Sequence, residues 1–453
     1  IVKRMAEEAR RRVLRPYLER DAYWWMGFRP GVRVNNWNPW CNTNVLASFL
    51  LFEPDGDVRE RGIRKIFRSM DVFIDTHPQD GCCDEGPMYW EHSGGKLFDI
   101  LDLLHRASGG RIDPFGERIV RDIGAYIYKV HIHDDYYVNF ADSDARMIHY
   151  PDVLFGYGER IGDEKLMRFG ASVPLRLRNH PYWFHLYRYA RELFQRSRRS
   201  SVEAAPPYVR DAWFEWTQVM TARSREGSRE GLFLAAKGGH NAESHSHNDV
   251  GNFIVYADGL PVLIDFGTEE YRVQTFSPNR FDIWVLQSSW HNLPTVRGVQ
   301  QRDGKAFAAA RDAAYRCTDE LAELVLDIAG AYPPEACISR WRRTFRLHRG
   351  EEQSAEIVDD YLLTEPTDDV RFSLISICRP EDAGEGAFQL EYAAGRKVRL
   401  LYDAGRFAAT VETVPLTDSR LRRSWPETAY RIVLCLRRAE ISGTCAVRVL
   451  YGG

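Results

Sequence analysis

The stretch from Gly238 to Gly267 constrains this chain more than any other. It packs three histidines into eight residues: His240, His245 and His247. Two apolar runs follow, the first from Asn252 to Tyr256 and the second ending on Asp265, with Asp258-Gly259 between them. An Asp-Gly pair between two apolar runs favours a tight β-hairpin. The sequence therefore predicts metal-competent side chains at the mouth of a hairpin.

The register of this hairpin decides where the histidines lie relative to Asp265. In an extended segment, His245 and His247 would point to the same face because they are two residues apart. A two-residue turn at Asp258-Gly259 would set Asn252 opposite Asp265, and His247 would lie beyond that pair. Residues 248–251 are turn formers ending in a glycine, so we expect the chain to fold back there. The alternative interpretation is a polar loop that carries surface histidines.

A fourth histidine, His291, lies in the loop SSWHNLPT at residues 288–295. Together, His247, Asp265 and His291 would make a site of two imidazoles and one carboxylate. Such a donor set suits zinc, with a fourth position left for water or another ligand. We therefore expect Zn²⁺, or another divalent metal such as Mn²⁺, as the cofactor.

The domain organisation follows from a change of pattern along the 453 residues, a length for which two domains are the natural expectation. Residues 1–200 show helical spacing of apolar residues, for example over 57–77 and 115–130. Residues 195–207 are basic and then Ser/Ala/Pro-rich, which is typical of a linker. From about residue 231, short β-rich runs follow one another. We expect an α+β multidomain protein, with a partial α/α toroid at 1–200 and an antiparallel β-sandwich at 201–453.

Composition narrows the class of ligand. The net charge is −3, so no electrostatic argument favours nucleic acid or membrane. The sequence contains no apolar run near 18 residues. Aromatic residues make up 13% of the chain. Large cores explain such a load, and so do sugar-binding clefts, in which rings serve as stacking platforms.

Cysteine usage bears on the compartment. The eight cysteines are scattered without a CxxC pair, and we interpret them as free thiols in a reducing, cytoplasmic compartment. No signal peptide is visible. Because the sequence begins at Ile1 rather than Met, we interpret it as a fragment. Secretion or periplasmic export stays an alternative if a leader precedes it.

Two segments of the helical half stand out chemically. Residues 35–44 contain five asparagines, more than one helix cap requires. They are interpreted either as capping plus a turn around Pro39 or as neutral hydrogen-bond donors on a pocket rim. Residues 80–90 form a Gly/Pro-containing loop that delivers Tyr89 just before a helix. As a general base, Tyr89 would need a pKa well below its usual value of about 10.

These motifs together resemble the heparinase II/III-like polysaccharide lyases. The resemblance is carried by HNAESHSHNDVGNF at 240–253, LIDFG at 263–267 and SSWHNLPT at 288–295. The segments NNWNPWCN at 35–42 and DEGPMYW at 84–90 are similar to the later part of the α/α toroid of that family. The usual toroid carries more helices, which fits a missing N-terminal portion.

The resemblance implies β-elimination on a uronic-acid polymer. Asn36, with Asn42 as the rival, would neutralise the substrate carboxylate. Tyr89 matches the family's tyrosine, as the acid and as a candidate base as well. His245 matches the catalytic histidine that carries the second proton. By the same match, His247, Asp265 and His291 would bind zinc, to brace the floor of the site.

The resemblance also implies an acidic polysaccharide or oligosaccharide as partner, and it places Tyr89 and His245 at one groove. We expect substrate contacts from seven further residues: Asn35, Trp37, Glu85, Trp90, His240, Glu243 and Arg280. Two alternatives remain open. One is a uronyl C5-epimerase, which abstracts the same proton without elimination, and the other is a non-catalytic carbohydrate-binding protein. Residues 139–146, polar and compact, are either a wall of the cleft or a structural turn.

Overall fold

The computed structural model describes residues 1–31, 34–174, 186–243, 245–307 and 311–452. The chain divides into two compact units. The helical unit consists of Ile1–Cys83, Tyr89–Ile127 and Ile148–Pro207, and the sheet unit consists of Asp84–Met88, Tyr128–Met147 and Tyr208–Gly453. Two short pieces from the first half of the sequence therefore belong to the sheet unit. The domain boundary at 200/201 stays a prediction.

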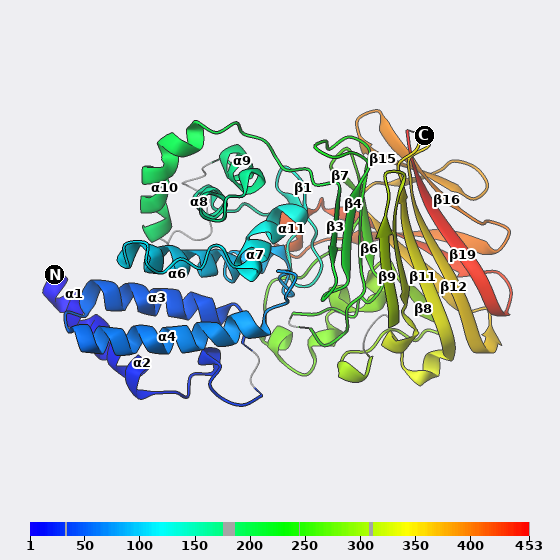
Figure 1. The fold of residues 1–453 in the computed structure, drawn as a ribbon. Helices are drawn as coiled ribbons and strands as arrows, with labels where there is room; N and C mark the ends of the chain where they lie inside the picture. The colour runs from blue at the N-terminus through cyan, green and yellow to red at the C-terminus, as the bar shows by residue number, and fades with distance from the viewer. Residues whose placement is uncertain (32–33, 175–185, 244, 308–310, 453) are drawn as a thin grey trace. The chain divides into compact units, whose positions relative to one another are not determined.

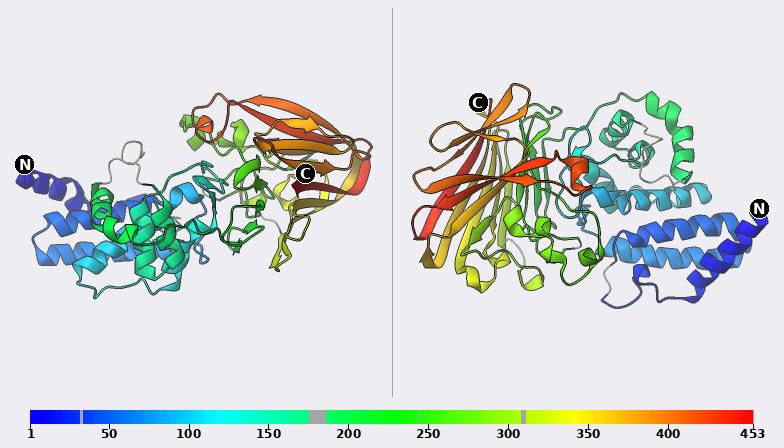
Figure 2. Two further views of the ribbon diagram at one scale, coloured as in Figure 1. Left: turned by 90° about the horizontal axis from the view of Figure 1, so that it is seen from above. Right: turned by 180° about the vertical axis from the view of Figure 1, so that it is seen from behind.

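The helical unit is built almost entirely of helices (Figure 1). They are α1 (Val2–Ala9), η1 (Arg10–Leu14), α2 (Arg15–Glu19), η2 (Trp24–Met26), α3 (Trp37–Phe52), α4 (Gly56–Thr76), α5 (Pro87–Trp90), α6 (Gly94–Ala107), α7 (Arg118–Lys129), α8 (Pro151–Ile161), α9 (Glu164–Ser172) and α10 (Leu186–Ser200). Helices α3, α4 and α6 run side by side (Figures 1 and 2). In the described part of the chain, no helix is long and apolar enough to cross a membrane.

Local sequence signals account for the ends of several helices. The side chain of Asp55 accepts a hydrogen bond from the Val58 amide and caps α4, and Gly162 ends α8 in the left-handed region at φ 69°. The expected helices over 57–77 and 115–130 are confirmed as α4 and α7. The expected linker begins later than predicted, because α10 continues through Ser200. Arginine is a good helix former, and Arg198 is further held by Glu159 at 2.9 Å.

A buried charge cluster holds α10 against its neighbours in the helical unit. The guanidinium of Arg188 is paired with Glu91, and its Nε lies 2.9 Å from the Asp99 carboxylate. Burial alone would raise the pKa of Glu91, but the charge of Arg188 lowers it to about 2. One turn further along α10, Arg191 binds Asp99 and Asp152, the first at 2.7 Å.

The sheet unit contains three large antiparallel sheets and one small one. The strands are β1 (His131–His133), β2 (Tyr136–Tyr137), β3 (Asp211–Phe214), β4 (Val219–Arg223), β5 (Leu232–Lys237), β6 (Phe253–Ala257), β7 (Leu260–Leu263), β8 (Pro294–Val296), β9 (Arg311–Cys317), β10 (Leu321–Asp327), β11 (Ile338–His348), β12 (Ser354–Thr367), β13 (Val370–Ser376), β14 (Pro380–Asp382), β15 (Ala387–Ala393), β16 (Arg396–Tyr402), β17 (Phe407–Pro415), β18 (Thr428–Leu436) and β19 (Glu440–Tyr451). The strand orders are β14-β15-β16-β19-β12-β11-β10-β9, β3-β4-β5-β6-β7, β17-β18-β13-β8 and β1-β2. Strands therefore begin earlier than the sequence indicated, at β1 in the small sheet and at β3 in the large sheets.

The predicted hairpin at Asp258-Gly259 is confirmed as β6–β7. Both turn residues have positive φ, 50° and 79°, as a tight hairpin turn of this type requires. The register then shifts by one between Val255 and Tyr256. Tyr256 lies opposite Pro261, which has no amide to donate to the ladder. The strict Asn252–Asp265 opposition expected from the turn is therefore not kept in the backbone.

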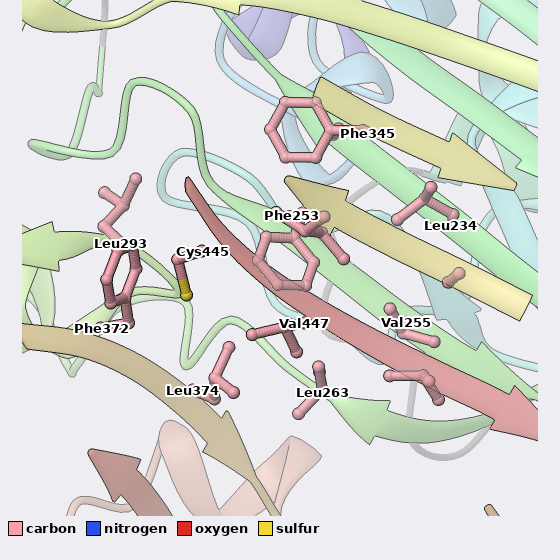
Figure 3. Close-up of a cluster of buried hydrophobic side chains, with 14 of the residues drawn as sticks. Leu234, Phe253, Val255, Leu263, Leu293, Phe345, Phe372, Leu374, Cys445 and Val447 are labelled. Carbon is pink, nitrogen blue, oxygen red and sulfur yellow. The ribbon is translucent and has the colours of Figure 1, made fainter. Parts of the chain in front are cut away.

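An apolar core lies among the three large sheets. Phe253 and Val255 on β6 pack with Phe345 on β11, Phe372 on β13 and Val447 on β19 (Figure 3). All five side chains are buried, and they come from each of the large sheets. Strand β6 is buried along its whole length, so both of its faces are covered. Burial of this kind fixes where β6 and β7 end.

The other face of the five-stranded sheet is covered by residues 128–147. Tyr136 packs edge-on against Tyr256 of β6, with ring centroids 5.7 Å apart. The Thr221 hydroxyl on β4 donates to the Lys129 carbonyl at 3.0 Å, and Arg223 donates to the His131 carbonyl at 2.6 Å. These contacts bring residues 139–144 to the start of β6, where the histidine-bearing loop ends, and to the end of β7, which Asp265 follows.

Candidate active site and metal centre

The loop between β5 and β6 carries the histidines of the sequence motif. The Gly251 amide donates to the Lys237 carbonyl at 2.9 Å and closes the loop back onto β5. The expected reversal over 248–251 is confirmed, with Gly251 at φ 87° and the Asn252 amide donating to the Asp249 carbonyl at 3.0 Å. The loop is therefore anchored at the place where it returns to the sheet.

His247, Asp265 and His291 come together at the ends of this sheet. Each side chain is fully buried, and one potential ligand atom from each lies within 4.8 Å of the others. The Nδ1 of His291 lies 3.0 Å from Oδ2 of Asp265. The two imidazole rings are 5.4 Å apart at their centroids. Three side chains from three separate loops thus converge as the sequence predicted.

The hydrogen bonding of these histidines fits a metal ion. Each imidazole has one ring nitrogen within hydrogen-bond distance of a carboxylate. Nδ1 of His291 lies 3.0 Å from Asp265, and Nε2 of His247 lies 3.1 Å from Asp142. The other nitrogens, Nδ1 of His247 and Nε2 of His291, have no hydrogen-bond partner among the described residues. Histidine ligands to metals typically donate their second ring nitrogen to a carboxylate in this way. A buried nitrogen without a partner is costly unless another group occupies it.

The charges around the site also favour a bound metal ion. With both histidines neutral, the carboxylates of Asp142 and Asp265 carry two negative charges, and the Arg280 guanidinium bound to Asp142 carries one positive charge. Burial alone would raise the pKa of Asp265, but a protonated His291, the form expected when no cation is bound, holds this pKa below its usual range through its charge and its hydrogen bond. Residual negative charge in a buried site favours a cation. The donor set, two imidazoles and a carboxylate, suits zinc.

Two buried asparagines fix the loops that carry these donors. The amide nitrogen of Asn252 donates to Oδ2 of Asp265 at 2.6 Å, so the side chains meet although the backbone register has shifted. Asn292, next to His291, donates to the carbonyls of Phe253 and Ile264 at 2.6 and 3.0 Å. Its backbone amide donates to Oδ1 of Asn252 at 3.0 Å. The asparagine pair therefore ties the His291 loop to the ends of β6 and β7.

A fully buried arginine supports the same corner from β11. Arg343 donates through Nη1 to the carbonyls of Gly251 and Asn292, both at 2.8 Å. Its charge is balanced by Asp359 on β12 at 2.9 Å. Arg343 and the asparagines were not among the predicted site residues. Arg343 and Asn292 bind backbone carbonyls that are at least 28 positions away in sequence, so no short-range spacing reveals these two residues.

His245 lies between two carboxylates of the sheet unit. Its Nδ1 is 2.7 Å from Oδ2 of Asp142, and its Nε2 is 3.4 Å from Oε2 of Glu85. Burial alone would lower the pKa of His245, but the hydrogen bond to Asp142 and the nearby carboxylate charges raise it. A histidine in this setting can accept a proton and hold it as an imidazolium ion.

The backbone at His245 differs from the extended form assumed for the two histidines. His245 has φ 55°, in the left-handed region that non-glycine residues rarely adopt. The two imidazoles therefore do not follow the same-face geometry of a strand. Instead, they reach two different oxygens of the same carboxylate, Asp142. Strained backbone of this kind persists only where the surroundings enforce it.

Asp142 is the main site residue that the sequence did not single out. Its fully buried carboxylate binds four side chains, those of His245, His247, Tyr271 and Arg280. Burial alone would raise the pKa of Asp142, but the hydrogen bonds from the two histidines hold it well below its usual range. The one available signal was the polar composition of residues 139–146. That signal fits a turn equally well, because the histidines are more than 100 positions away.

Three predicted substrate contacts in the sheet unit are engaged with the protein itself. Arg280 donates to Asp142 at 2.7 Å and to the Ser246 carbonyl at 3.2 Å. The Glu243 side chain, 8% exposed, lies 3.5 Å from the Lys237 ammonium, and burial raises its pKa to about 7. The Ala242 amide donates to Nδ1 of His240 at 3.1 Å. Substrate contacts of these residues stay predictions, while their observed contacts stabilise the loop.

Tyr89 and the asparagine segment belong to the helical unit. Tyr89 lies on α5 and is half-buried, with its ring 6.2 Å from that of His92. Asn36 precedes α3 and is 7% exposed. Asn35 accepts a hydrogen bond from the Trp37 amide, and the Trp37 side chain is 52% exposed. The roles of these residues in catalysis or binding stay predictions.

The structure corrects the prediction for Trp90 and weakens that for Asn42. Trp90 is fully buried, and its indole donates to the Ile123 carbonyl at 2.7 Å, so it is a core residue and not a substrate contact. Asn42 is also fully buried. Its amide oxygen accepts from Tyr17 at 3.0 Å and its nitrogen donates to the Ser69 hydroxyl at 2.9 Å, between α3 and α4. A side chain committed to helix packing is a poor partner for a substrate carboxylate, which leaves Asn36 as the stronger candidate.

Comparison with known proteins identifies the family of the sheet-rich region. Residues 221–441 match the profile described as heparinase II/III-like, C-terminal. The resemblance seen in the sequence is thereby confirmed for this region. Sequence comparison with curated proteins gives no match.

Solved structures share the fold at low sequence identity. Heparan sulfate lyase HepC from Pedobacter heparinus is 14% identical, with a TM-score of 0.65, over 94% of this chain and 61% of that one. A heparinase III, the BT4657 gene product, is 13% identical, with a TM-score of 0.66, over 91% and 58%. The Streptomyces coelicolor A3 chondroitin AC lyase, in complex with chondroitin sulphate, is 13% identical, with a TM-score of 0.55, over 93% and 62%. The chain thus has a mixed helix and sheet architecture like these lyases and spans about three fifths of their length.

Proposed function

We propose that this chain is a polysaccharide lyase that cleaves a uronic-acid-containing, glycosaminoglycan-like polymer by β-elimination. Residues 221–441 match the heparinase II/III-like, C-terminal family, which is consistent with this proposal. The observation that carries the proposal is the setting of His245 between two carboxylates beside the buried His247–Asp265–His291 cluster. In the same proposal, the helical unit is the later part of an α/α toroid and the large sheets form a β-sandwich.

The first task of the reaction is to loosen the C5 proton of the uronate. That proton is weakly acidic until the adjacent carboxylate is neutralised, and Asn36 is the proposed hydrogen-bond donor for this purpose. His245 then accepts the proton at Nε2. The Asp142 carboxylate, bound to Nδ1, stabilises the imidazolium ion that forms.

The second task is to release the glycosidic oxygen. As the C5–H bond breaks, its electron pair forms the C4–C5 double bond and the C4–O bond breaks. Tyr89 is proposed to give its phenolic proton to the departing oxygen. The products are a 4,5-unsaturated uronate and a new chain end, and both proton carriers return to their starting state by exchange with solvent.

Zinc is the proposed cofactor, held by His247, Asp265 and His291. The two ring nitrogens that have no hydrogen-bond partner within the described part of the chain, Nδ1 of His247 and Nε2 of His291, support this assignment. When bound, the metal would supply a fixed positive charge that braces the floor of the site. Proton transfer is assigned to this chain's own residues.

The test is a panel of heparan sulfate, chondroitin sulfate, hyaluronan and alginate, with ultraviolet absorbance of the unsaturated product as the readout. At least one polymer is expected to give absorbance, and Tyr89→Phe is expected to lower the rate by at least 10²-fold. Tyr189→Phe, on α10, is the matched control. If C5 takes up deuterium from the solvent without absorbance, the protein is an epimerase. Binding without either signal would make it a non-catalytic carbohydrate-binding protein.

A further inference from the structure

We propose that Asp142 is a positioning residue that sets both imidazoles of the HxH pair at once. One carboxylate assigns the ring proton of His247 to Nε2 and that of His245 to Nδ1. His247 is thereby left with Nδ1 for a metal ion. His245, with Nδ1 held by Asp142 at 2.7 Å, is left with Nε2 for proton transfer, and the more distant Glu85 carboxylate, at 3.4 Å from Nε2, stabilises the proton once this nitrogen has accepted it. The inference rests on the proposed function for the role of His245, and it stands independently of that function for the role of His247.

The chemistry of the carboxylate carries the assignment. An ionised carboxylate only accepts hydrogen bonds, so each ring nitrogen that binds it must carry a proton. Asp142 binds His245 through Oδ2 at 2.7 Å and His247 through Oδ1 at 3.1 Å. In a neutral imidazole the second nitrogen then holds the lone pair. For His247 that nitrogen is Nδ1, which has no hydrogen-bond partner among the residues that the structure describes.

The backbone around Asp142 is built for close approach. Ala141, directly before it, has φ 62°, in the left-handed region. Gly86 and Gly267 face the same segment. A Cβ at Gly86 would lie 2.8 Å from the Phe140 carbonyl oxygen, and one at Gly267 would lie 2.8 Å from that of Ser143. Only residues without a side chain fit at these two positions. The segment is therefore seated between two glycines.

Polar contacts fix the same segment from both sides. The side chain of Asn139 donates to the Asp265 carbonyl at 2.9 Å, so the segment is tied to a candidate metal ligand. Arg420 donates to the Asp142 carbonyl at 2.8 Å and to the Asp144 carboxylate at 2.7 Å. His245 and Ala141, the residue before Asp142, both have left-handed backbone, and the hydrogen bond between His245 and Asp142 joins the two segments. Such backbone indicates a geometry that the fold enforces at a cost.

Charge balance for Arg280 is the competing explanation of a carboxylate here. Arg280 shares Oδ1 of Asp142 with His247. A carboxylate that served only the guanidinium would not need its second oxygen, which binds His245 and the Tyr271 hydroxyl at 2.7 and 3.0 Å. The two explanations differ in what happens to the histidines when the carboxylate becomes an amide.

The discriminating variant is Asp142→Asn, because an amide of the same shape has one accepting oxygen and one donating nitrogen. One of the two imidazoles must then lose its acceptor. Zinc affinity, measured by chelator competition without substrate, is expected to fall 10- to 100-fold. With zinc at saturation, kcat on the most active polymer is expected to stay about 100-fold below wild type, while KM changes less than about 3-fold.

Asp144→Asn is the matched control, because Asp144 lies in the same segment and binds Arg420 but neither histidine. It is expected to keep zinc affinity within about 3-fold of wild type. Wild-type zinc affinity in Asp142→Asn would overturn the assignment for His247. Full recovery of kcat at saturating zinc would overturn it for His245.

A second measurement needs no variant. In crystals of the wild-type protein soaked with Zn²⁺, the ion is expected on Nδ1 of His247, and an ion on Nε2 would overturn the proposal. If the wild-type protein releases no unsaturated product from any polymer, the proposed function fails. The zinc affinities and the soaked crystal then still decide the role of Asp142 toward His247.

Discussion

Each unit of this molecule buries a cluster of carboxylates, and the two clusters are balanced differently. In the helical unit the partners are mainly arginines, as where Arg188 lies against Glu91 and Asp99. In the sheet unit the partners are mostly histidines, as where Asp142 binds His245 and His247. This difference in the partners indicates which of the two clusters can exchange a proton or bind a metal ion. A carboxylate paired with arginine is neutralised once and for all, whereas one paired with histidine leaves a proton, or a place for a metal ion, to be exchanged.

The charge count supports this contrast. The helical cluster contains three carboxylates, those of Glu91, Asp99 and Asp152, and three cations, those of Lys96, Arg188 and Arg191. Its sum is zero. Around His247, two carboxylates face one arginine, with the histidines neutral. We therefore expect substitutions in the helical cluster to lower the free energy of unfolding, and substitutions around His247 to lower the activity.

The largest effect is expected for His245→Ala. Removing the proton carrier should lower kcat by about 10⁴-fold, the upper range for general acid–base catalysis. The thermal transition should move little, because the side chain is partly exposed and charged groups surround it. Product absorbance and circular dichroism measure the two quantities. His348→Ala, on the surface of the same unit, is the control. If His245→Ala lowered the stability strongly and left kcat unchanged, the histidine cluster would be structural rather than catalytic.

The next effect is expected for Arg188→Met in the helical unit. It removes the cation that is paired with Glu91 and one of the cations that contact Asp99, which costs about 3–5 kcal/mol of unfolding free energy. Denaturant unfolding followed by far-ultraviolet circular dichroism measures this. Arg64→Met, whose side chain is 75% exposed, should change stability by less than about 0.5 kcal/mol. Equal effects of the two variants would show that the buried cluster is not structural.

The pH dependence of the helical unit should follow Glu91. Its pKa is about 2 in the folded protein against 4.5 when exposed, so the unfolded chain binds the proton more readily. Glu91 therefore contributes on the order of 3 kcal/mol above pH 4.5, and this contribution is lost as the pH falls toward 2. The difference in stability between wild type and Glu91→Gln, measured at several pH values, should shrink over that range. A constant difference would contradict the assignment.

The smallest effect is expected from zinc itself. A ligand at 100 times its dissociation constant stabilises the folded state by about 2.7 kcal/mol. Zinc should therefore raise the unfolding transition of the wild type, and a chelator should reverse the change. In His247→Ala both responses should disappear. If zinc stabilises His247→Ala as much as the wild type, the ion binds elsewhere.

Much of the framework was readable from sequence because it depends on local spacing. The hairpin at Asp258-Gly259 follows from two residues that tolerate positive φ between apolar runs. The approach of His247 to Asp265 needs in addition the chain reversal over 248–251, which the turn formers there predicted. His291 was grouped with His247 and Asp265 because the three side chains make a zinc-like donor set, and the resemblance of its loop to a known family implied the same set. Helices α4 and α7 followed from apolar residues at helical steps.

Two predictions of substrate contacts, those for Trp90 and Asn42, depended on whether the side chain is buried, which the packing between helices decides. Trp90 follows Tyr89 directly, and a sequence cannot tell which of two aromatic residues in a one-turn helix faces the core. The fold buries Trp90 and leaves Tyr89 half-exposed. Asn42 has the same composition signal as Asn36, but its place one turn inside α3 commits it to Ser69 on α4. In both cases the neighbour that decides lies on another helix.

The sequence by itself determined the chemical inventory, which is the imidazoles and the carboxylate, and the tight turn between β6 and β7, whose geometry depends on adjacent residues alone. Only the tertiary structure decided how that inventory is tuned. Asp142 reaches His245 and His247 because residues 128–147 cover one face of the five-stranded sheet, a contact between segments about 100 residues apart. Hydrogen-bond partners at such separations are set by how apolar faces pack, and that information is spread over the whole core rather than written beside the histidines.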